Sequence, residues 1–255
     1  MDQALGCSDE AAERCLLDVA PGRLPLALAD LHRALPVGSV LHLEVGTDDK
    51  HDASAMDDDR LRDLLVGAGF EPDRVGVAGA PGRFEARARR ARTLPDTVGA
   101  AMRLLICGLN PSLYAADAGV AFARPGNRFW PAALAARIVS VDRDPDHALR
   151  HHGIGMTDLV KRATVAADEL STAEYRTGLA RLERLVRWLR PGGVCFVGLA
   201  GWRAAVDRRA PPGRQAQRLG DAPVYLMPST SGLNARTSLG QLEGHLRAAA
   251  AAAVR

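Results

Sequence analysis

The sequence of 255 residues contains no apolar run that approaches the roughly 18 to 20 residues of a membrane-spanning helix. It begins with an acidic segment, residues 1–14, which lacks the basic start and the apolar block of a secretory signal peptide. Cysteine is scarce, and the four cysteines present are too scattered for a disulfide scaffold. Together these absences predict a soluble protein of the reducing cytoplasm that is neither membrane-bound nor secreted.

The patterns that metal sites require are also missing. Cys107 and Cys195 fall inside predicted strands with no close cysteine partner, which favours apolar packing over an iron–sulfur cluster. His147, His151 and His152 lack a matching carboxylate or cysteine pattern, and a solvated helix end explains them better than a metal site. We therefore expect no metal and no cofactor.

Net charge is unevenly distributed along the chain. The whole chain carries +3, but residues 1–100 carry −6 and residues 101–255 carry +9. Two parts of opposite charge suggest two structural units, and the basic one is a candidate for binding a polyanion such as nucleic acid. Because 31 of the 33 basic residues are arginine, a general preference for arginine in the source proteome would also explain the excess.

Apolar periodicity and turn residues predict a small α/β unit in the first part of the chain. Proline and polar residues at 93–96 mark a boundary, so we expect this unit to span residues 1–95. Its predicted elements are a helix over 24–35, a strand over 39–45, an acidic loop over 48–59, a helix capped by Asp57 or Asp58 and ending near Gly67, and two extended segments in 74–79 and 83–90 on either side of a turn.

Strands and helices alternate in the second part, residues 100–255, which is typical of a parallel sheet covered by helices on both faces. The fold class we predict is a three-layer α/β/α sandwich with a central, mostly parallel sheet, preceded by the small α/β unit. The predicted strands are 102–107, 194–199 and 224–227, and the predicted helices are 130–139, 172–190 with Ser171 as its cap, 202–208 and 238–252.

Two loops stand where ligands bind in such sheets, beyond the carboxyl ends of the strands. The first, GLNPS at 108–112, follows the first buried strand, and the second, PSTSGLNAR at 228–236, follows the last. Asn110 could orient a water with its amide oxygen or bind a ligand carbonyl, and the alternative is that it caps the following turn, as an isolated Asn-Pro more often does.

Two apolar side chains near these loops also admit two interpretations. Phe122 lies in a polar stretch broken by glycine and proline, where it could stack on a nucleic-acid base or anchor the loop in the core. Leu233 follows a glycine, and it could act as a wedge in a base stack or pack in the core. Ser229, Ser231 and Arg236 are suited to phosphate oxygens.

These residues together resemble a known enzyme family. The run GLNPSLYAADAGVAFARPGNRFWPA, followed about 100 residues later by MPSTSGLNAR, resembles the motifs of the uracil-DNA glycosylase superfamily. The likeness is greatest to its mismatch-specific branch, the Mug and thymine-DNA glycosylase family, with its motifs G-[IL]-N-P and F-A-x-P-x-N-R-F-W. The segment GMTDLVKRATVAADELS, residues 155–171, is similar to the connecting stretch of that family.

The resemblance implies a role for each residue of the two loops. Asn110 would position the hydrolytic water beneath the anomeric carbon of the sugar, and Phe122 would stack on the extruded base. Backbone amides around Leu109 would bind the base carbonyls, and Leu233 would enter the duplex from the minor groove. The remaining implied contacts are Gly108 and Ser112 to the base, and Arg128, Ser229, Ser231, Gly232, Asn234 and Arg236 to DNA.

The implied function is that of a monofunctional DNA glycosylase of base excision repair. It would extrude uracil mispaired with guanine from double-stranded DNA and hydrolyse the N-glycosidic bond, leaving an abasic site. Thymine, ethenocytosine or hypoxanthine would be further substrate bases. Where other uracil glycosylases have an Asp as water activator, this chain has Asn110, so we expect modest turnover, slow product release and activity that does not titrate on this residue.

Two further expectations accompany the resemblance. The enzyme would act as a monomer on the bacterial nucleoid, without a membrane or a metal cluster. The alternative is a catalytically weak protein that binds damaged bases or abasic sites and releases no base.

The N-terminal part carries a weaker resemblance, over about residues 15–92. The segments LADLHRALPVGSVLHLEV, DDDRLRDLLVGAGFEPDRVGV and FEARARR are similar to the C-terminal half of a class I methyltransferase. No Gly-rich fingerprint follows a strand here, which predicts that the unit does not bind S-adenosylmethionine. It would be a degenerate, non-catalytic appendage. If the remainder folds, deleting residues 1–95 would leave base excision largely intact and increase non-specific DNA affinity at low salt.

Overall fold

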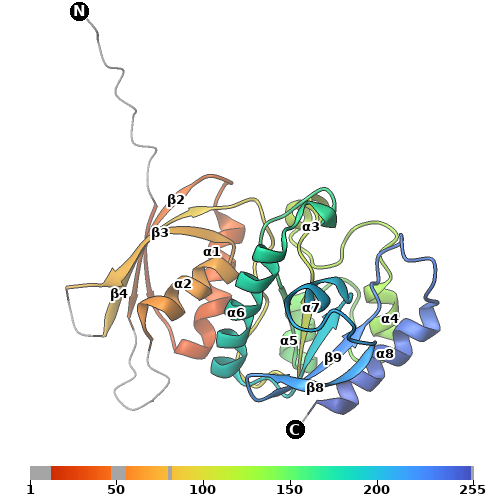
Figure 1. Ribbon diagram of the computed structural model, residues 1–255. Coiled ribbons are helices and arrows are strands. Elements are labelled where there is room, and N and C mark those ends of the chain that lie inside the picture. The colour runs from red at the N-terminus through yellow and green to blue at the C-terminus, as the bar shows by residue number, and fades with distance from the viewer. Residues whose placement is uncertain (1–12, 47–55, 80–81, 254–255) are drawn as a thin grey trace, which may run out of the picture.

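Two β-sheets lie beside each other in the computed structural model of the protein, which describes residues 13–46, 56–79 and 82–253 (Figure 1). The first sheet and two helices form the N-terminal part, and the second sheet, with helices on both faces, forms the rest of the chain. Cys7 and parts of the predicted loop over 48–59 and of the turn at 80–82 lie outside the described residues.

The N-terminal sheet has the strand order β1-β2-β4-β3. β1 runs parallel to β2, and β4 is antiparallel to both of its neighbours. Along β2 the side chains alternate, because Leu41 and Leu43 are buried in the core whereas His42 and Glu44 are exposed. The elements are β1 (Glu13–Asp18), the 3-10 helix η1 (Pro21–Arg23), α1 (Leu24–Ala34), β2 (Val40–Gly46), α2 (Asp58–Gly67), β3 (Phe70–Val77) and β4 (Arg83–Arg90).

The start of α2 follows from its local sequence. Asp57 caps α2 as predicted, because its carboxylate accepts a hydrogen bond of 2.7 Å from the backbone N–H of Arg60.

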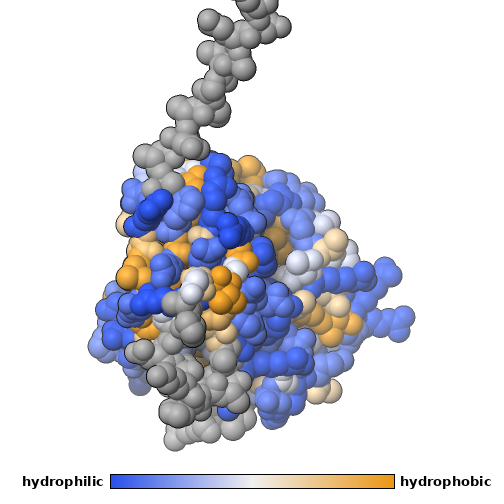
Figure 2. Space-filling view, turned by 90° about the vertical axis from the view of Figure 1, so that its left-hand side faces the viewer, coloured by the Kyte–Doolittle hydropathy of each residue, from blue (hydrophilic) through white to orange (hydrophobic). Residues whose placement is uncertain are grey.

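On the side of the molecule that Figure 2 shows, hydrophilic residues surround smaller apolar areas. The open face of the sheet is thus largely polar.

The second sheet has the strand order β6-β5-β7-β9-β8, with β8 antiparallel to β9 and the other neighbours parallel. Its elements are β5 (Leu104–Gly108), α3 (Leu113–Ala118), α4 (Phe129–Ala135), α5 (Pro145–His152), β6 (Ile154–Asp158), the 3-10 helix η2 (Ala167–Glu169), α6 (Thr172–Leu189), β7 (Val194–Val197), α7 (Ala200–Ala205), β8 (Gly213–Leu219), β9 (Ala222–Met227) and α8 (Leu239–Ala252).

Helices cover both faces of this sheet. Leu105 and Cys107 of β5 belong to the core cluster that contains side chains of α6 and α7, whereas Leu104 and Ile106 belong to the cluster of α4 and α8. Alternate residues of one strand are therefore buried on opposite sides, which is why β5 reads as a continuous apolar run. The predicted three-layer α/β/α sandwich with a mostly parallel sheet is confirmed.

Several elements differ from the prediction, and β1 and α3 were not predicted at all. The pattern missed β6, which has only five residues, of which Gly155, Thr157 and Asp158 interrupt its apolar character. It also missed β8, an edge strand whose side chains are mostly polar. The helix predicted over 130–139 ends earlier, because α4 stops at Ala135 and Arg137 turns the chain with a φ of 57°.

The predicted boundary at 93–96 is a buried crossing between the two sheets. Thr93, Leu94 and Asp96 each expose 5% or less of their surface. The backbone N–H of Asp96 donates a 2.8 Å hydrogen bond to the carbonyl of Gly67, at the end of α2. The polar residues that marked the predicted boundary are packed and hydrogen-bonded.

A continuous apolar core joins the two parts of the molecule. α6 lies between the two sheets (Figure 1), and its Leu185 belongs to the same buried cluster as Leu64 of α2. Arg184 of α6 pairs with Asp63 of α2 at 2.6 Å. The N-terminal part is therefore packed against the second sheet's helical layer.

The cysteines of the second sheet are buried in its strands. Burial raises the pKa of both Cys107 and Cys195, as expected for thiols that pack as apolar side chains. His147, His151 and His152 gather at the end of α5, but no group of side chains able to hold a metal occurs in the described ranges. Within the same ranges, no helix has the length and apolar character to cross a membrane.

Candidate active site

The carboxyl ends of β5, β6, β7 and β9 border a cavity of about 490 Å³. The two predicted loops line it from both sides, together with the segment that follows β6. Residues more than 100 positions apart, such as Asn110 and Leu233, therefore belong to one site, as expected for the carboxyl edge of a parallel sheet.

Asn110 stands where β5 leaves the sheet, and three acceptors surround its amide nitrogen. Nδ2 lies 3.0 Å from the carbonyl oxygen of Arg162, 3.2 Å from that of Pro111 and 2.8 Å from Oγ1 of Thr164. Carbonyl oxygens cannot donate, so the nitrogen must face them and the orientation of the amide is fixed. No described residue donates to Oδ1 of Asn110, which leaves this oxygen to accept a hydrogen bond from a ligand or water.

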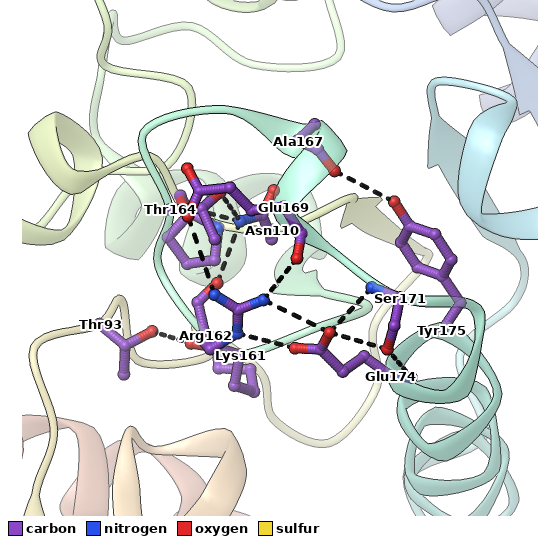
Figure 3. A network of polar contacts seen from close by, with 11 residues as sticks. Thr93, Asn110, Lys161, Arg162, Thr164, Ala167, Glu169, Ser171, Glu174 and Tyr175 are labelled. Atoms are coloured by element: carbon purple, nitrogen blue, oxygen red, sulfur yellow. Dashed lines mark hydrogen bonds and ion pairs between the residues drawn. The ribbon is translucent and has the colours of Figure 1, made fainter.

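The segment that holds Asn110 is itself anchored to α6 (Figure 3). The Arg162 guanidinium donates to Glu174 at 2.7 Å and to the carbonyl of Glu169 at 2.9 Å. Glu174 also accepts from the backbone N–H of Ser171 in the capping box that begins α6. The hydrogen bonds from Arg162 and Ser171 lower the pKa of Glu174 to about 2, so its carboxylate stays ionised. A rigid helix thus fixes the carbonyl to which Asn110 donates.

Phe122 is anchored in the core and also lines the cavity, where stacking on a base stays a prediction. Its ring stacks on Phe129, with centroids 4.2 Å apart and planes at 23°, which anchors it to the core. Its φ of 57° lies in the left-handed region that residues other than glycine rarely adopt. This backbone conformation is unfavourable by on the order of 1–3 kcal/mol. The half-buried ring lines the cavity. The strained backbone therefore presents a supported aromatic ring at the cavity wall.

β6 brings a carboxyl group into the same cavity. Asp158 is the last residue of β6 and exposes only 8% of its surface. A Cβ atom on Gly108 would lie 2.2 Å from Oδ1 of Asp158 and 3.6 Å from Cζ of Phe122. Glycine at 108 therefore leaves the space that the Asp158 carboxyl occupies.

A buried ion network lies behind Asp158. Asp96 lies 2.7 Å from Nζ of Lys161, 3.0 Å from a guanidinium nitrogen of Arg181 and 2.7 Å from Oγ1 of Thr157. Burial alone would raise the pKa of Asp96, but the two cations outweigh it and the pKa is lowered. Burial also raises the pKa of Asp158, to about 6, because Lys161 and Arg181 offset it only in part.

The second loop presents Leu233 to solvent, with 87% of the residue exposed. Hydrogen bonds within the loop hold this conformation. The backbone N–H of Ser231 donates to Oγ of Ser229 at 3.2 Å, and that of Leu233 donates to Oγ of Ser231 at 3.3 Å. Asn234 donates from Nδ2 to the carbonyl of Ser229 at 2.7 Å. The serines and the asparagine thus shape the loop.

Arg128 holds this loop from the far end of the first motif. Its guanidinium donates to the carbonyl oxygens of Thr237 and Asn234, both at 2.5 Å, and its backbone N–H donates to that of Thr230 at 2.9 Å. The resemblance implies a DNA contact for Arg128, but its guanidinium faces backbone carbonyls, and we propose that it positions the loop. Arg236 is exposed, as a phosphate ligand would be.

A family model described as the uracil DNA glycosylase superfamily matches residues 95–252, which is more than half of the chain. The match includes both loops, the buried crossing from Asp96 onward and the end of β6.

The protein belongs to the uracil DNA glycosylase superfamily. Members of this superfamily are DNA glycosylases, which are hydrolases that act on DNA. Residues 1–94, which include the N-terminal sheet, lie outside the match.

A solution NMR structure of a candidate uracil DNA glycosylase from Methanosarcina acetivorans is among the similar solved structures. The two chains share 21% sequence identity, with a TM-score of 0.44, and the similarity covers 61% of this chain and 96% of the other.

Most residues predicted for the uracil DNA glycosylase site meet at the cavity. Ser112 caps α3, since its Oγ accepts from the backbone N–H of Ala115 at 3.2 Å. Gly232, Asn234, Arg236 and Arg128 are outside the lining. The predicted residues that line the cavity are Gly108, Leu109, Asn110, Ser112, Phe122, Ser229, Ser231 and Leu233.

Asp158 and Thr164 are two polar lining residues that the sequence reasoning did not single out. One signal could have found Asp158: it follows the short apolar stretch Ile154–Met156 just as Asn110 follows the first strand. No comparable signal exists for Thr164, because its contact with Asn110 depends on the path of an irregular segment.

Proposed function

We propose that this uracil DNA glycosylase superfamily member hydrolyses the N-glycosidic bond of uracil mispaired with guanine in double-stranded DNA and leaves an abasic site. The amide of Asn110 carries the proposal. Its Nδ2 is held by acceptors on three residues, and its Oδ1 is left to accept a hydrogen bond at the cavity. A fixed acceptor can hold a water in line with the anomeric carbon, which supplies part of the rate acceleration.

The remaining groups serve base extrusion and binding. The glycosidic bond cannot be reached while the base is stacked in the duplex, so the nucleotide must be extruded. Unstacking and unpairing the base costs a few kcal/mol. Leu233 is exposed, and the hydrogen bond from its backbone N–H to Ser231 holds it in the conformation from which its side chain would insert into the gap. Phe122, supported by Phe129, offers its ring to the extruded base.

The mismatch preference follows from the same energetics. Extrusion takes least free energy where pairing is weakest, as in a G·U pair compared with a Watson–Crick pair. An enzyme with few side chains that read the base can therefore select a mispaired base through the stability of the pair. Thymine, ethenocytosine and hypoxanthine opposite guanine define the base range to be tested.

Replacing Asn110 with Ala tests the proposal. We expect the single-turnover rate of uracil release from a G·U duplex to fall by about 10²-fold or more, because water positioning is lost. Gln215→Ala, which removes an amide from the edge strand β8, is the matched control and should leave the rate unchanged. A near-native rate for the Asn110 variant would contradict the assignment.

The alternative is a protein that binds damaged DNA and does not cleave it. Both functions predict affinity for mismatched duplexes, but only a glycosylase releases the free base. Incubation with duplexes that carry each candidate base, followed by alkaline cleavage at abasic sites, separates the two. Strand cleavage that requires both the protein and alkali supports a monofunctional glycosylase.

We also propose that residues 1–95 form a non-catalytic unit. Among the described residues of this unit, only Leu94, which lies on the buried crossing after the sheet, lines the cavity. The resemblance to a methyltransferase half stays a prediction, as does the expectation that the protein acts as a monomer.

A further inference from the structure

Asp158 has no role in the reaction outlined so far, although it lines the cavity and is buried. Its backbone carbonyl accepts hydrogen bonds from Arg181 and Thr157. No residue in the described part of the chain donates to its carboxyl oxygens. A buried carboxyl group with unused hydrogen-bonding capacity is unfavourable in the free protein, which points to a ligand as its partner.

The location of the carboxyl indicates what that ligand offers. Oδ1 of Asp158 and Cζ of Phe122 both lie within 3.6 Å of the point where a Cβ on Gly108 would stand. The carboxyl group and the end of the aromatic ring therefore lie in the same part of the cavity. A base stacked on Phe122 would direct its own edge, which carries the carbonyl and N–H groups, toward Asp158.

We propose that Asp158 is a catalytic residue that acts in its neutral form, by donating a hydrogen bond from its O–H to a carbonyl oxygen of the departing base. As the bond between C1′ and the base nitrogen breaks, the electron pair goes to the base and spreads onto its carbonyl oxygens. The water oxygen bonds to C1′ and releases one proton to solvent, from which the departed base anion is protonated. The proton stays on Asp158 and stabilises the developing charge. This inference rests on the proposed glycosylase function and deepens it.

The proposal also defines the class of base. A neutral carboxyl group offers a donor beside an acceptor, which complements an N–H next to a carbonyl. Uracil, thymine and hypoxanthine all carry this lactam edge. Ethenocytosine lacks the N–H, so we expect it to react more slowly than uracil in the same mispair.

The charged and titratable groups around Asp158 come from four elements. Lys161 lies on the segment after β6, Arg181 on α6, Asp96 on the buried crossing and Cys107 on β5. Asp96 is kept ionised by the two cations, and burial keeps the Cys107 thiol neutral because its pKa is raised well above its usual value. Of the three acidic groups, Asp158 is therefore the one that changes charge near neutral pH.

The sign of the pH dependence follows from the active form. Burial raises the pKa of Asp158 to about 6, so the neutral acid predominates below that pH and the carboxylate above it. The carboxylate has no proton to donate and places negative charge beside the base anion. The rate should therefore fall as the pH rises through the pKa, by up to about tenfold per pH unit.

The test compares single-turnover uracil release from a G·U duplex between about pH 5 and pH 9 for the wild type, Asp158→Asn and Asp158→Ala. Asn keeps a donor and an acceptor but does not ionise, so this variant should remain active with a flat profile. Ala should be slower by about 10²-fold at acidic pH, also with a flat profile. A flat wild-type profile, or a falling limb that persists in Asp158→Asn, would overturn the proposal.

A second base separates a catalytic role from a structural one. 5-Fluorouracil leaves more readily than uracil, so its anion depends less on an external donor. The loss of rate in Asp158→Ala should therefore be several-fold smaller for 5-fluorouracil than for uracil, whereas a packing defect would slow both equally. If the wild type releases no base at any pH, the proposed function fails and this inference with it. If base is released and Asn110→Ala prevents it while the pH profile is flat, only the role of Asp158 fails.

Discussion

At the scale of single residues, Leu233 is unusual because a large apolar side chain is held in solvent. The residue is 87% exposed, and its backbone N–H is bound to Ser231. Burying a leucine is worth roughly 1.5–3 kcal/mol, and the free protein forgoes this gain. Binding to an opened duplex would recover it, because the gap left by the base is an apolar environment between stacked bases.

Leu233→Ala should therefore weaken excision only where there is a stack to fill. We expect the rate for G·U duplex to fall by about tenfold, which corresponds to ~1.4 kcal/mol of lost apolar contact, and the rate for uracil in single-stranded DNA to change little. Leu239→Ala, at the start of α8, is the control for loss of an exposed leucine. An equal loss on both DNA forms would argue against a wedge.

Individual site residues differ in how far the sequence could predict them. Asn110, Phe122 and Leu233 stand out because they interrupt local patterns, and the structure brings all three to the cavity. Arg128 could not be assigned, since the carbonyls that its guanidinium binds belong to a loop more than 100 residues away. Asp158 was missed because its significance depends on strand pairing, with Asp158 aligned to Gly108 across β6 and β5.

At the scale of elements, the segment after β6 links α6 to Asn110 through hydrogen bonds. Arg162 connects the two, since its side chain binds Glu174 and its carbonyl accepts from Asn110. The Arg162–Glu174 pair is partly exposed, so its effect on stability is small, as for most surface ion pairs. Its value is geometric, because it orients the carbonyl that fixes the amide.

Glu174→Gln should therefore reduce catalysis more than stability. We expect a several-fold fall in the single-turnover rate with little change in the melting temperature, because the Arg162 anchor loosens while the helix persists. Glu183→Gln is a matched control, as it breaks the Arg187–Glu183 pair on the same helix. A fall in melting temperature that parallels the fall in rate, or no fall in rate, would contradict a positioning role for the anchor.

The elements that the sequence predicted share strong local signals. α6 and α8 have serine caps and apolar periodicity, and β5, β7 and β9 are buried runs. β6 and β8 have weak signals, because one is short and interrupted and the other is an edge strand with polar side chains. Such strands form through pairing with neighbours distant in the chain, which a local pattern does not contain.

At the scale of the whole molecule, the buried crossing changes what the N-terminal part is expected to do. The sequence suggested a non-catalytic appendage whose removal would leave excision largely intact if the remainder folds. In the structure, Asp96 of this crossing binds Lys161 and Arg181 in the interior, and α2 shares its apolar core with α6. The N-terminal part thus covers apolar surface of the helical layer beside the site.

Deleting residues 1–92 should therefore impair folding, and folding of the remainder is the condition on which the expectation from sequence depended. We expect poor solubility or a melting temperature lowered by well over 10 °C, since apolar surface of α6 becomes exposed. Circular dichroism of the full-length and shortened proteins measures this, and the full-length protein should unfold in one transition. Val77→Asp, at an exposed position of β3, is a control for change within the N-terminal sheet. A shortened protein with native melting and excision would restore the picture of a dispensable appendage.

The burial of Lys161 also bears on what happens to DNA after the base has left. An abasic sugar opens to an aldehyde, and a free amine can condense with it and break the strand. The chain has only two lysines, Lys50 and Lys161. The ammonium of Lys161 is bound to Asp96 and to the carbonyl of Leu94, and its side chain is 8% exposed. Because Lys161, the lysine that the described residues contain, is held in the interior, we expect the abasic strand to leave the enzyme unbroken, so that its incision would require a separate nuclease.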